Sequence, residues 1–436
     1  MHLKKIIKTK TICVCLVFFA YVSAYSQPFG GGSGTQQDPY QIYNIGHLEE
    51  LRDSIYHIIA NRNRTTNRHY ILMNDITDSV RFTIGGNFSS HGSTHFRGYF
   101  NGNGFTITIA LDSGGALFGG LDSNRIIENL NVDGRINSVH DRGYAAGICL
   151  FNYDQRGFFY GGIIRNCNNY ATIDVDGPEP AGITVANRGF VIDCNNYGSI
   201  YFTRGYAGGI CARNSSLVQN SNNYGLIQGR GYVTFQFSIG YVGGIVGSNG
   251  ITGQVIGCNN YGEIDIETGF SVGGIVGHNE GFVSHCINSG NLKHDNFWGG
   301  NVGGIVGNNG ISEFDTSSTS PRIIEFCLNI GSIKSISEGS SFRGGFAGGI
   351  AGRCAEERTG RANSLIGVFN NANYGFVEGI GKNRIGGIVG DNNYNKTVLQ
   401  NNFNSGVVVT DDPTNTNIGC IIGNNNGNAT LINKPL

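Results

Sequence analysis

A glycine-flanked apolar signature recurs along most of this chain. Its form is Gly-Gly-Ile-Val-Gly or a close variant, and its central position is apolar in all ten copies. The central residues are Leu117, Ile148, Ile183, Ile210, Ile245, Ile275, Ile305, Ile350, Ile388 and Ile421. Because the same position stays apolar in every repeat, we expect these side chains to point inward and form one aliphatic stack. Glycine beside them permits a close backbone approach or a positive φ.

A second signature, Cys-x-Asn-Tyr-Gly-x-Ile, follows each of the first nine copies. Its last position is always apolar: Ile136, Ile173, Ile200, Ile227, Ile264, Leu292, Ile333, Val377 and Val408. Its Asn position holds Asn169, Asn196, Asn223, Asn260, Asn288, Asn329, Asn373 and Asn404, and the first copy has Val132 there. Asn tolerates the left-handed region and can form amide ladders along a stack.

The spacing of the copies indicates the fold class. It ranges from 27 residues (Cys167 to Cys194) to 44 (Cys327 to Asn371), which excludes coiled coils and collagen. Short β-branched segments separated by Gly and Asn indicate strands and tight turns, with no helical stretch between them that would suggest βαβ units. The sequence therefore predicts an all-β parallel β-helix, in which equivalent residues of successive coils stack about 4.8 Å apart.

The chain also resembles a known family. The Gly-Gly-Ile-Val-Gly copies, together with the segments 34–53, 69–77 and 96–109, resemble secreted bacterial proteins that carry GLUG repeats, over residues 34–430. The resemblance implies a right-handed parallel β-helix (a solenoid) and an adhesin-like role outside the cell or at its surface. Some family members are attached to metallopeptidases, but this chain contains no His-Glu-x-x-His motif, so that activity does not carry over.

The N-terminal residues indicate export and a cap. Four lysines precede a short apolar run from Thr11 to Tyr21, and small residues near Ala24 suit cleavage, so we predict that residues 1–24 are a signal peptide. Residues 25–95 are expected to form an N-terminal cap segment with one amphipathic helix, and residues 96–436 the β-helix. The helix is indicated by Ile45, Leu48, Leu51 and Ile55 at helical spacing, after a possible N-cap at Asn44. It would protect the open edge of the first coil.

Composition narrows the function class. Apolar residues make up 39% and charged residues 14% of the chain, which argues against disorder. The formal charge of −1 gives no basic footprint, so we expect no nucleic-acid partner. No later apolar run is long enough to span a membrane once the signal is removed. We expect an exported, secreted or cell-surface protein with no cofactor.

Five cysteines share one position of the second signature, which Leu130, Ser221, Asn371 and Asn402 fill elsewhere: Cys167, Cys194, Cys258, Cys286 and Cys327. The position accepts an apolar side chain, so buried packing is the favoured interpretation. Disulfides such as Cys167–Cys194 or Cys258–Cys286 are the alternative. No ligand spacing predicts a metal site.

Two further patterns are candidate surfaces. Tyr170, Tyr197, Tyr224, Tyr261 and Tyr374 would line one edge, either as a stabilising aromatic stack, which we favour, or as a sugar-binding track. Alternating acids at Asp174/Asp176 and Glu263/Asp265/Glu267 would share a strand face, where they could bind Ca²⁺ or act as acid and base. Because intervening copies lack these acids, a solvated outer face is favoured.

Aromatic residues crowd three insertions, and loops of a rigid scaffold often carry function. The crowded residues are Phe151, Tyr153, Phe158, Phe159 and Tyr160; Tyr232, Phe235, Phe237 and Tyr241; and His294, Phe297 and Trp298. From these we select Phe158, Tyr160, Tyr232, Phe235, Phe237 and Trp298 as candidate ligand-binding residues. The alternative is local packing of each loop onto its own coil.

The sequence favours a non-enzymatic adhesin-like or glycan-binding protein, with an extracellular glycan or a host or cell-surface protein as partner and no catalytic residue assigned. The alternatives are a polysaccharide-active lyase or glycosidase on a β-helix scaffold and a purely structural surface component, since fold does not imply function. An enzyme would need carboxylates with Lys or Arg gathered in one groove.

Overall fold

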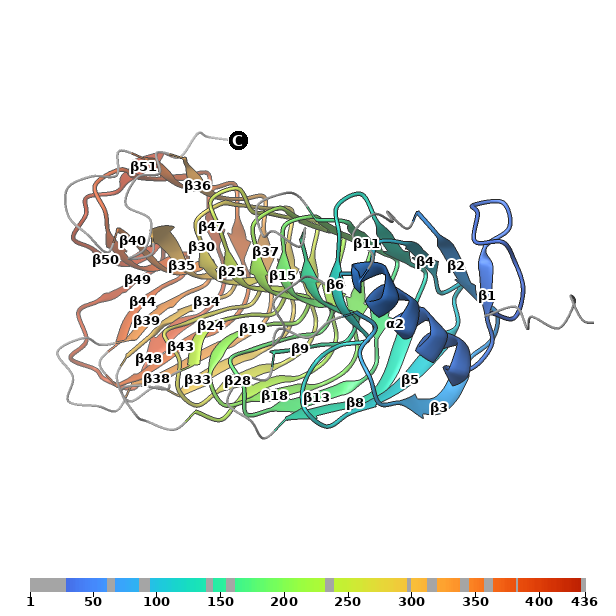
Figure 1. Cartoon of the computed structure of the whole chain (residues 1–436). Coiled ribbons are helices and arrows are strands. Elements are labelled where there is room, and N and C mark those ends of the chain that lie inside the picture. The colour runs from blue at the N-terminus through green and yellow to red at the C-terminus, as the bar shows by residue number, and fades with distance from the viewer. Residues whose placement is uncertain are drawn as a thin grey trace, which may run out of the picture.

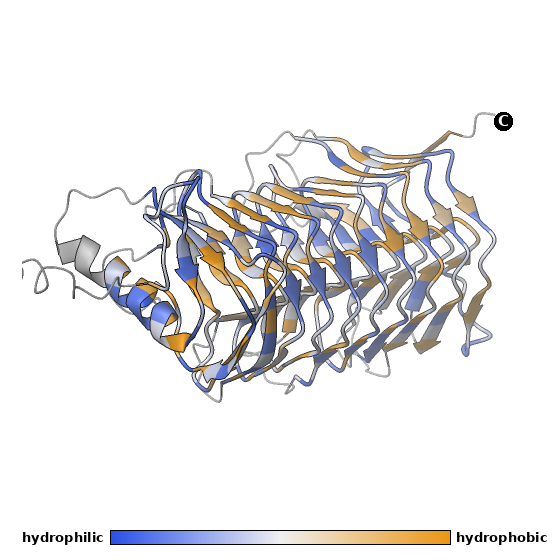
Figure 2. Ribbon diagram, turned by 90° about the vertical axis from the view of Figure 1, so that its right-hand side faces the viewer, coloured by the Kyte–Doolittle hydropathy of each residue, from blue (hydrophilic) through white to orange (hydrophobic). Residues whose placement is uncertain are grey.

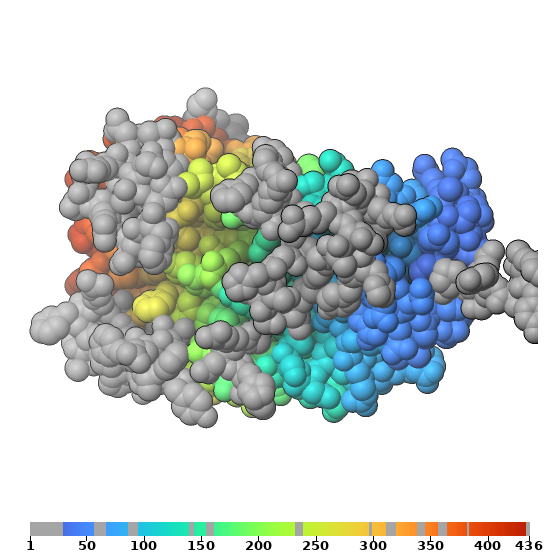
Figure 3. Space-filling view, viewed as in Figure 1, coloured from blue at the N-terminus to red at the C-terminus, as the bar shows by residue number. Residues whose placement is uncertain are grey.

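The computed structural model describes residues 29–60, 67–85, 95–138, 144–153, 161–231, 239–295, 299–311, 320–337, 345–356, 364–381 and 383–432. In these residues the chain is nearly all β, with one helix and long parallel sheets stacked along one axis (Figure 1). The arrangement is that of a parallel β-helix, as the repeat pattern predicts. In the space-filling view, chain order follows the long axis from one end to the other (Figure 3).

A thirteen-strand sheet forms one side of the coils, and every pairing in it is parallel. Its strands are β1 (Tyr40–Ile42), β2 (His69–Leu72), β4 (Tyr99–Asn101), β7 (Ile126–Glu128), β11 (Ile163–Arg165), β16 (Phe190–Ile192), β21 (Leu217–Gln219), β26 (Gln254–Ile256), β31 (Phe282–Ser284), β36 (Arg322–Glu325), β41 (Ile366–Phe369), β46 (Thr397–Gln400) and β51 (Thr430–Ile432).

A ten-strand sheet and a nine-strand sheet form two further sides. The ten-strand sheet holds β6 (Phe118–Leu121), β10 (Cys149–Asn152), β15 (Thr184–Asn187), β20 (Cys211–Asn214), β25 (Val246–Asn249), β30 (Val276–Asn279), β35 (Val306–Ile311), β40 (Ala351–Glu356), β45 (Val389–Asn393) and β50 (Ile422–Asn425). The nine-strand sheet holds β9 (Tyr144–Ala146), β14 (Glu179–Ala181), β19 (Gly205–Gly208), β24 (Ile239–Gly243), β29 (Ser271–Gly273), β34 (Asn301–Gly303), β39 (Gly345–Gly348), β44 (Asn383–Gly386) and β49 (Ile418–Gly419).

The remaining sheet begins with β3 (Ile76–Val80), β5 (Thr106–Leu111) and β8 (Asn131–Ser138), and then divides into two files because β8 pairs with both β12 and β13. One file is β12 (Asn168–Asn169), β17 (Asn195–Asn196), β22 (Asn222–Asn223), β27 (Asn259–Asn260), β32 (Ile287–Asn288), β37 (Leu328–Asn329), β42 (Ala372–Asn373) and β47 (Phe403–Asn404). The other is β13 (Thr172–Val175), β18 (Ile200–Phe202), β23 (Ile227–Gly229), β28 (Ile264–Ile266), β33 (Leu292–Asp295), β38 (Ile333–Ser337), β43 (Val377–Gly381) and β48 (Val408–Thr410).

The central residues of the first signature stack as predicted. The backbone N–H of Ile210 donates to the carbonyl of Ile245 at 3.0 Å, and that of Ile245 donates to Ile275 at 3.0 Å. The side chains are completely buried in one continuous core, except that Ile421 in the last coil is partly buried. In Figure 2 the apolar strand positions recur coil after coil along the rod.

The Asn residues of the second signature form a buried amide ladder. Nδ2 of Asn223 donates to Oδ1 of Asn260 at 2.9 Å, and Nδ2 of Asn260 donates to Oδ1 of Asn288 at 2.9 Å. Glycine of the first signature packs on this ladder, since a Cβ on Gly244 would lie 2.4 Å from the Asn260 amide carbon. The two signatures are therefore two halves of one packing unit, with glycine required where the backbone meets the amide.

The left-handed residues lie elsewhere than we expected. Positive φ falls one residue before the cysteine position, as at Asn166 (50°) and Asn220 (49°), and not at the ladder asparagines. Phe326 adopts φ of 52° at the same point in its coil. The ladder asparagines thus serve through their amide hydrogen bonds. The residue before the cysteine position serves instead through the left-handed conformation that the turn requires.

The helix α2 (Ile45–Ala60) lies at the N-terminal end of the stack (Figures 1 and 2). Asn44 caps it, because its Oδ1 accepts from the N–H of His47 at 3.1 Å. Leu48 and Leu51 are fully buried in the same core as the coils. The segment 25–95 also supplies β1, β2 and β3, so it contributes strands to the sheets as well as the helix.

We predict that Asn260→Ala lowers the free energy of unfolding by about 2 kcal/mol, because the change leaves buried amide and carbonyl partners unsatisfied. Asn259→Ala is the matched control. Asn259 sits in a half-buried outer ladder, so it should cost less than about 1 kcal/mol. Urea denaturation of both variants measures the difference, and equal losses would contradict a special role for the inner ladder.

Candidate functional site

The six selected ligand-binding aromatics fall outside the described residues. In sequence, Phe158 and Tyr160 lie between β10 and β11; Tyr232, Phe235 and Phe237 lie between β23 and β24; and Trp298 lies between β33 and β34. Their role in binding stays a prediction.

Other aromatics named with these loops prove to belong to strands and packed clusters. His294 lies in β33 and is fully buried, with Nε2 3.0 Å from the carbonyl of Gly269. Phe151 lies in β10 and packs against Tyr144 and Tyr153. Assigning His294 and Phe151 to loop insertions is wrong, because both lie in strands and their side chains are buried.

The tyrosines of the second signature form a regular column. Rings of Tyr170, Tyr197, Tyr224 and Tyr261 stack with centroids 4.8, 4.8 and 4.9 Å apart, and each ring is about half exposed. The faces of the inner rings cover one another, so a sugar cannot stack face-on against them. Tyr374 lies outside this column, beside Phe403. The stabilising stack is therefore the interpretation that the geometry supports.

The alternating acids lie on a solvated face, as favoured above. Asp174, Asp176, Glu263 and Glu267 are exposed, and Asp265 pairs with Lys293 at 3.4 Å. In the described part of the chain, no group of three or more His, Cys, Asp or Glu side chains is arranged to hold a metal ion.

The cysteines are packing residues in the described structure. Cys167, Cys194, Cys258, Cys286 and Cys327 are free and buried, and Cys420 is the exposed one among the nine described. Burial raises the pKa of the Cys149 and Cys354 thiols to about 12, so both stay protonated at neutral pH. Such thiols are poor nucleophiles, which excludes these two from thiolate catalysis.

The outer faces of the ten-strand and nine-strand sheets meet along a line that we call the seam. A Cβ on Gly277 would lie 2.6 Å from the backbone nitrogen of Val242, so the two backbones come together only over small residues. Near its N-terminal end, Ala146, Ala181 and Val185 belong to a small apolar cluster separate from the main core. Farther out, side chains of the two sheets face each other: Glu179, Tyr206, Arg213, Tyr241, His278, Phe346, Arg353, Arg384 and Asp391.

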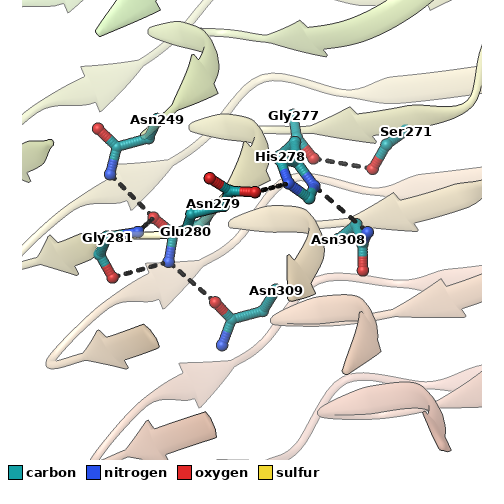
Figure 4. Close-up of polar contacts among 9 residues, drawn as sticks. All are labelled: Asn249, Ser271, Gly277, His278, Asn279, Glu280, Gly281, Asn308 and Asn309. Atoms are coloured by element: carbon teal, nitrogen blue, oxygen red, sulfur yellow. Dashed lines mark hydrogen bonds and ion pairs between the residues drawn. The ribbon is translucent and has the colours of Figure 1, made fainter. Parts of the chain in front are cut away.

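Aromatic and charged groups stack along the seam. The Arg213 guanidinium lies 4.6 Å from the Tyr206 ring centroid, Tyr206 stacks on Tyr241 at 5.0 Å, and Tyr241 stacks on His278 at 4.5 Å. Nε2 of His278 lies 3.3 Å from Glu280, and its Nδ1 lies 3.3 Å from the Asn308 amide (Figure 4). These contacts join the two sheets across four coils.

Beside His278 runs a second amide ladder. Nδ2 of Asn249 donates to Asn279, and Nδ2 of Asn279 donates to Asn309, each at 2.8 Å (Figure 4). The next coil places Cys354 at this position, and Nδ2 of Asn309 has no hydrogen-bond partner among the described residues. Cys354 therefore interrupts the ladder, which resumes one coil later where Nδ2 of Asn392 donates to Asn425 at 2.7 Å.

The three described carboxylates of the seam are too far apart to act as a paired acid and base. Glu179, Glu280 and Asp391 are separated by three coils each, or about 14 Å. Glycosidase carboxylates lie about 5 to 10 Å apart. Ser271 donates its hydroxyl to the carbonyl of Gly277 and not to His278, so His278 does not activate Ser271 as a nucleophile.

A cleft of about 470 Å³ lies on the outer face of the thirteen-strand sheet, at its N-terminal end. Its lining residues are Gln36, Pro39, His69, Tyr70, Ile71, Tyr99, Asn101, Ile126, Glu128 and Arg165. They come from the loop before β1 and from the adjacent strands β2, β4, β7 and β11. Strand alternation turns the strand residues among them outward, except Tyr70, which lies in the core with Phe100 and Ile127.

The cleft combines an apolar floor with polar edges. His69 and Tyr99 are cross-strand partners whose rings stack at 4.3 Å, so their edges, with Ile71 and Ile126, line the floor. Arg125 donates to the Tyr99 hydroxyl at 3.1 Å and fixes that ring. Arg165 donates to Glu128 at 2.7 Å, beside Asn101 and Gln36. Burial lowers the pKa of His69, which favours a neutral imidazole in the cleft at neutral pH.

Sequence reasoning missed this cleft. His69 and Tyr99 lie in segments that carry the family resemblance but in none of the ten repeats, so repeat alignment does not bring them together. The available signal was strand alternation, which places both on the outer face, but their pairing depends on a connection of 26 residues between β2 and β4.

Comparisons with known proteins assign no activity. No family model matches the chain. A segment of 135 residues is 29% identical to a protein of Evansella cellulosilytica named "Putative Gly-rich membrane protein", covering 28% of this chain and 15% of that protein. The chain thus matches only a small part of that relative's length. It is also similar to the solved structure of a "putative immunoglobulin A1 protease" from Bacteroides ovatus, at 19% identity and a TM-score of 0.48, covering 61% of this chain and 80% of that one.

In the part of the chain that the structure describes, no helix has the length and apolar character needed to cross a bilayer. The predicted signal peptide, residues 1–24, lies outside the described residues.

We predict that His294 makes stability depend on pH. Burial lowers its pKa to about 4, whereas an unfolded histidine titrates near 6.5. As pH falls from 6.5 towards 4, the unfolded chain gains a proton that the folded chain does not, so the folded state loses stability. The loss from this group is roughly 2 kcal/mol between pH 7.5 and pH 5.

Urea denaturation at both pH values measures this loss, and His294→Asn should reduce the difference by a similar amount. An unchanged pH dependence in the variant would show that other groups cause it.

Proposed function

We propose that this chain is an exported, non-enzymatic parallel β-helix protein that binds glycans, with the right-handed winding and the helical cap that the resemblance and the sequence pattern imply. The cleft on the thirteen-strand sheet is its binding site. The GLUG-type resemblance and the predicted signal peptide support a place outside the cell or at its surface.

One observation carries the proposal: an apolar floor made by His69, Tyr99 and Ile126 lies within a polar rim of Gln36, Asn101, Glu128 and Arg165. A pyranose has the complementary character, because its C–H groups pack on apolar surface while its hydroxyls exchange hydrogen bonds. The cleft volume of about 470 Å³ falls in the usual range for small-molecule sites. The rim offers both donors and acceptors, which suits hydroxyl groups.

The enzyme alternative has less support. Among the described residues, Glu128 is the one carboxylate that lines the cleft, and Arg165 already pairs with it. A second carboxylate at working distance is missing from the lining, so neither the retaining nor the inverting arrangement is present there. Binding without bond cleavage is the simpler outcome of this geometry.

We predict that Tyr99→Ala weakens glycan binding at least tenfold, because it removes the floor of the cleft and the partner of His69. Binding partners are first found with wild-type protein on a glycan array, and affinities of the variants are then measured by calorimetry. Tyr261→Ala, at the end of the exposed tyrosine column, is the matched control and should change affinity less than twofold.

Equal losses in the two variants would place binding on the tyrosine column. Unchanged affinity in Tyr99→Ala would remove the cleft as the site. Release of reducing ends from a bound glycan by wild-type protein would overturn the non-enzymatic assignment.

A further inference from the structure

Charges in the seam are paired one to one near its N-terminal end but not farther along. Buried Glu179 pairs with Arg213, which also covers the Tyr206 ring. Four coils later, at the register position equivalent to Arg213, stands Arg353. There two arginines, Arg353 and Arg384, share the single carboxylate of Asp391.

The two guanidinium groups are held side by side. Nη1 of Arg384 donates to Oδ1 of Asp391 at 2.7 Å, and Asn424 donates to the same oxygen at 2.6 Å. Arg353 approaches Oδ2 at 3.5 Å without hydrogen-bond geometry, so its buried Nε is left unpartnered. Both groups also lie against the Phe346 ring, Arg353 at 5.3 Å and Arg384 at 5.2 Å from its centroid.

Among the described residues, this arrangement leaves one positive charge uncompensated. Asp391 is 1% exposed by its side chain, while Arg353 is 22% and Arg384 is 36% exposed. The register neighbours on the ten-strand sheet, Asn308 and Asn424, are neutral. Two like charges at a partly buried site repel each other more strongly than in water, and a second anion would relieve that repulsion.

The guanidinium groups also have unused donors. Arg384 has one hydrogen bond and Arg353 has none among the described residues. Each guanidinium carries five N–H groups in a planar fork that fits the oxygens of a carboxylate or a sulfate. Contacts with Asp391 and Phe346 hold both guanidinium groups in place, so little side-chain entropy remains to be lost when an anion binds.

We propose that Arg353 and Arg384 form a binding site for an oxyanion, the carboxylate or sulfate group of an acidic glycan. This rests on the proposed function for the glycan, whereas the oxyanion chemistry rests on the seam alone. The seam site would bind the charged group of the glycan, while the cleft binds its neutral sugar surface. The two sites lie near opposite ends of the rod.

The test uses calorimetry with three probes of equal length: a sulfated oligosaccharide, an oligogalacturonate and a neutral oligosaccharide. Arg353→Gln and Arg384→Gln should each weaken binding of the charged probe at least tenfold and flatten its salt dependence, and leave the neutral probe unchanged. Each variant leaves Asp391 one guanidinium partner, so folding is expected to persist, and circular dichroism checks it. Stronger binding of the sulfated probe or of the oligogalacturonate identifies the anion.

The matched control replaces Glu179 and Arg213 together by Gln, because Arg213→Gln alone would bury an unpaired carboxylate. This double variant should bind charged probes within twofold of wild type. Equal weakening in the control, or no binding of either charged probe by wild type, overturns the inference. If Tyr99→Ala loses binding of the neutral probe while Arg353→Gln binds the charged probes as tightly as wild type, the seam site is overturned and the cleft remains the binding site.

Discussion

The structure depends on the hydrogen bonds that join each coil to the next in register. Because Ile210, Ile245 and Ile275 are linked N–H to carbonyl, every side chain must contact the residue at the same place one coil away. A residue type can therefore repeat only if it is compatible with its own copy. Isoleucine packs on isoleucine, and asparagine both donates to and accepts from asparagine.

The same constraint explains which residues do not repeat. Stacked carboxylates would repel at this separation, and Asp174 accordingly lies beside Tyr201, while Asp265 lies between Gln228 and Lys293. Tyrosine repeats four times on the exposed edge because its rings stack and its hydroxyls stay in water. What looks like a repeated binding stripe in the sequence is in this case a consequence of stacking.

The candidate sites lie where self-similarity ends. The cleft is built by β2, β4 and β7 at the N-terminal end, where His69, Tyr99 and Ile126 replace one another at one register position. The cationic group of the seam appears where Asn308 gives way to Arg353 and Asp391. Where different residues occupy equivalent positions, the surface gains differences in shape and charge that a uniform stack cannot provide. Recognition of a ligand needs such differences.

The sequence by itself determined the stacking of the coils, the inward isoleucines and the inner Asn ladder, because each follows from a residue type that recurs at one position. It also placed the helix that starts after Asn44. It wrongly assigned His294 and Phe151 to loop insertions, because the local composition does not show that these residues are buried in strands. Only the tertiary structure decided that His69 meets Tyr99 and that Arg353 meets Arg384, because these contacts join residues 30 or more apart through coils whose lengths vary.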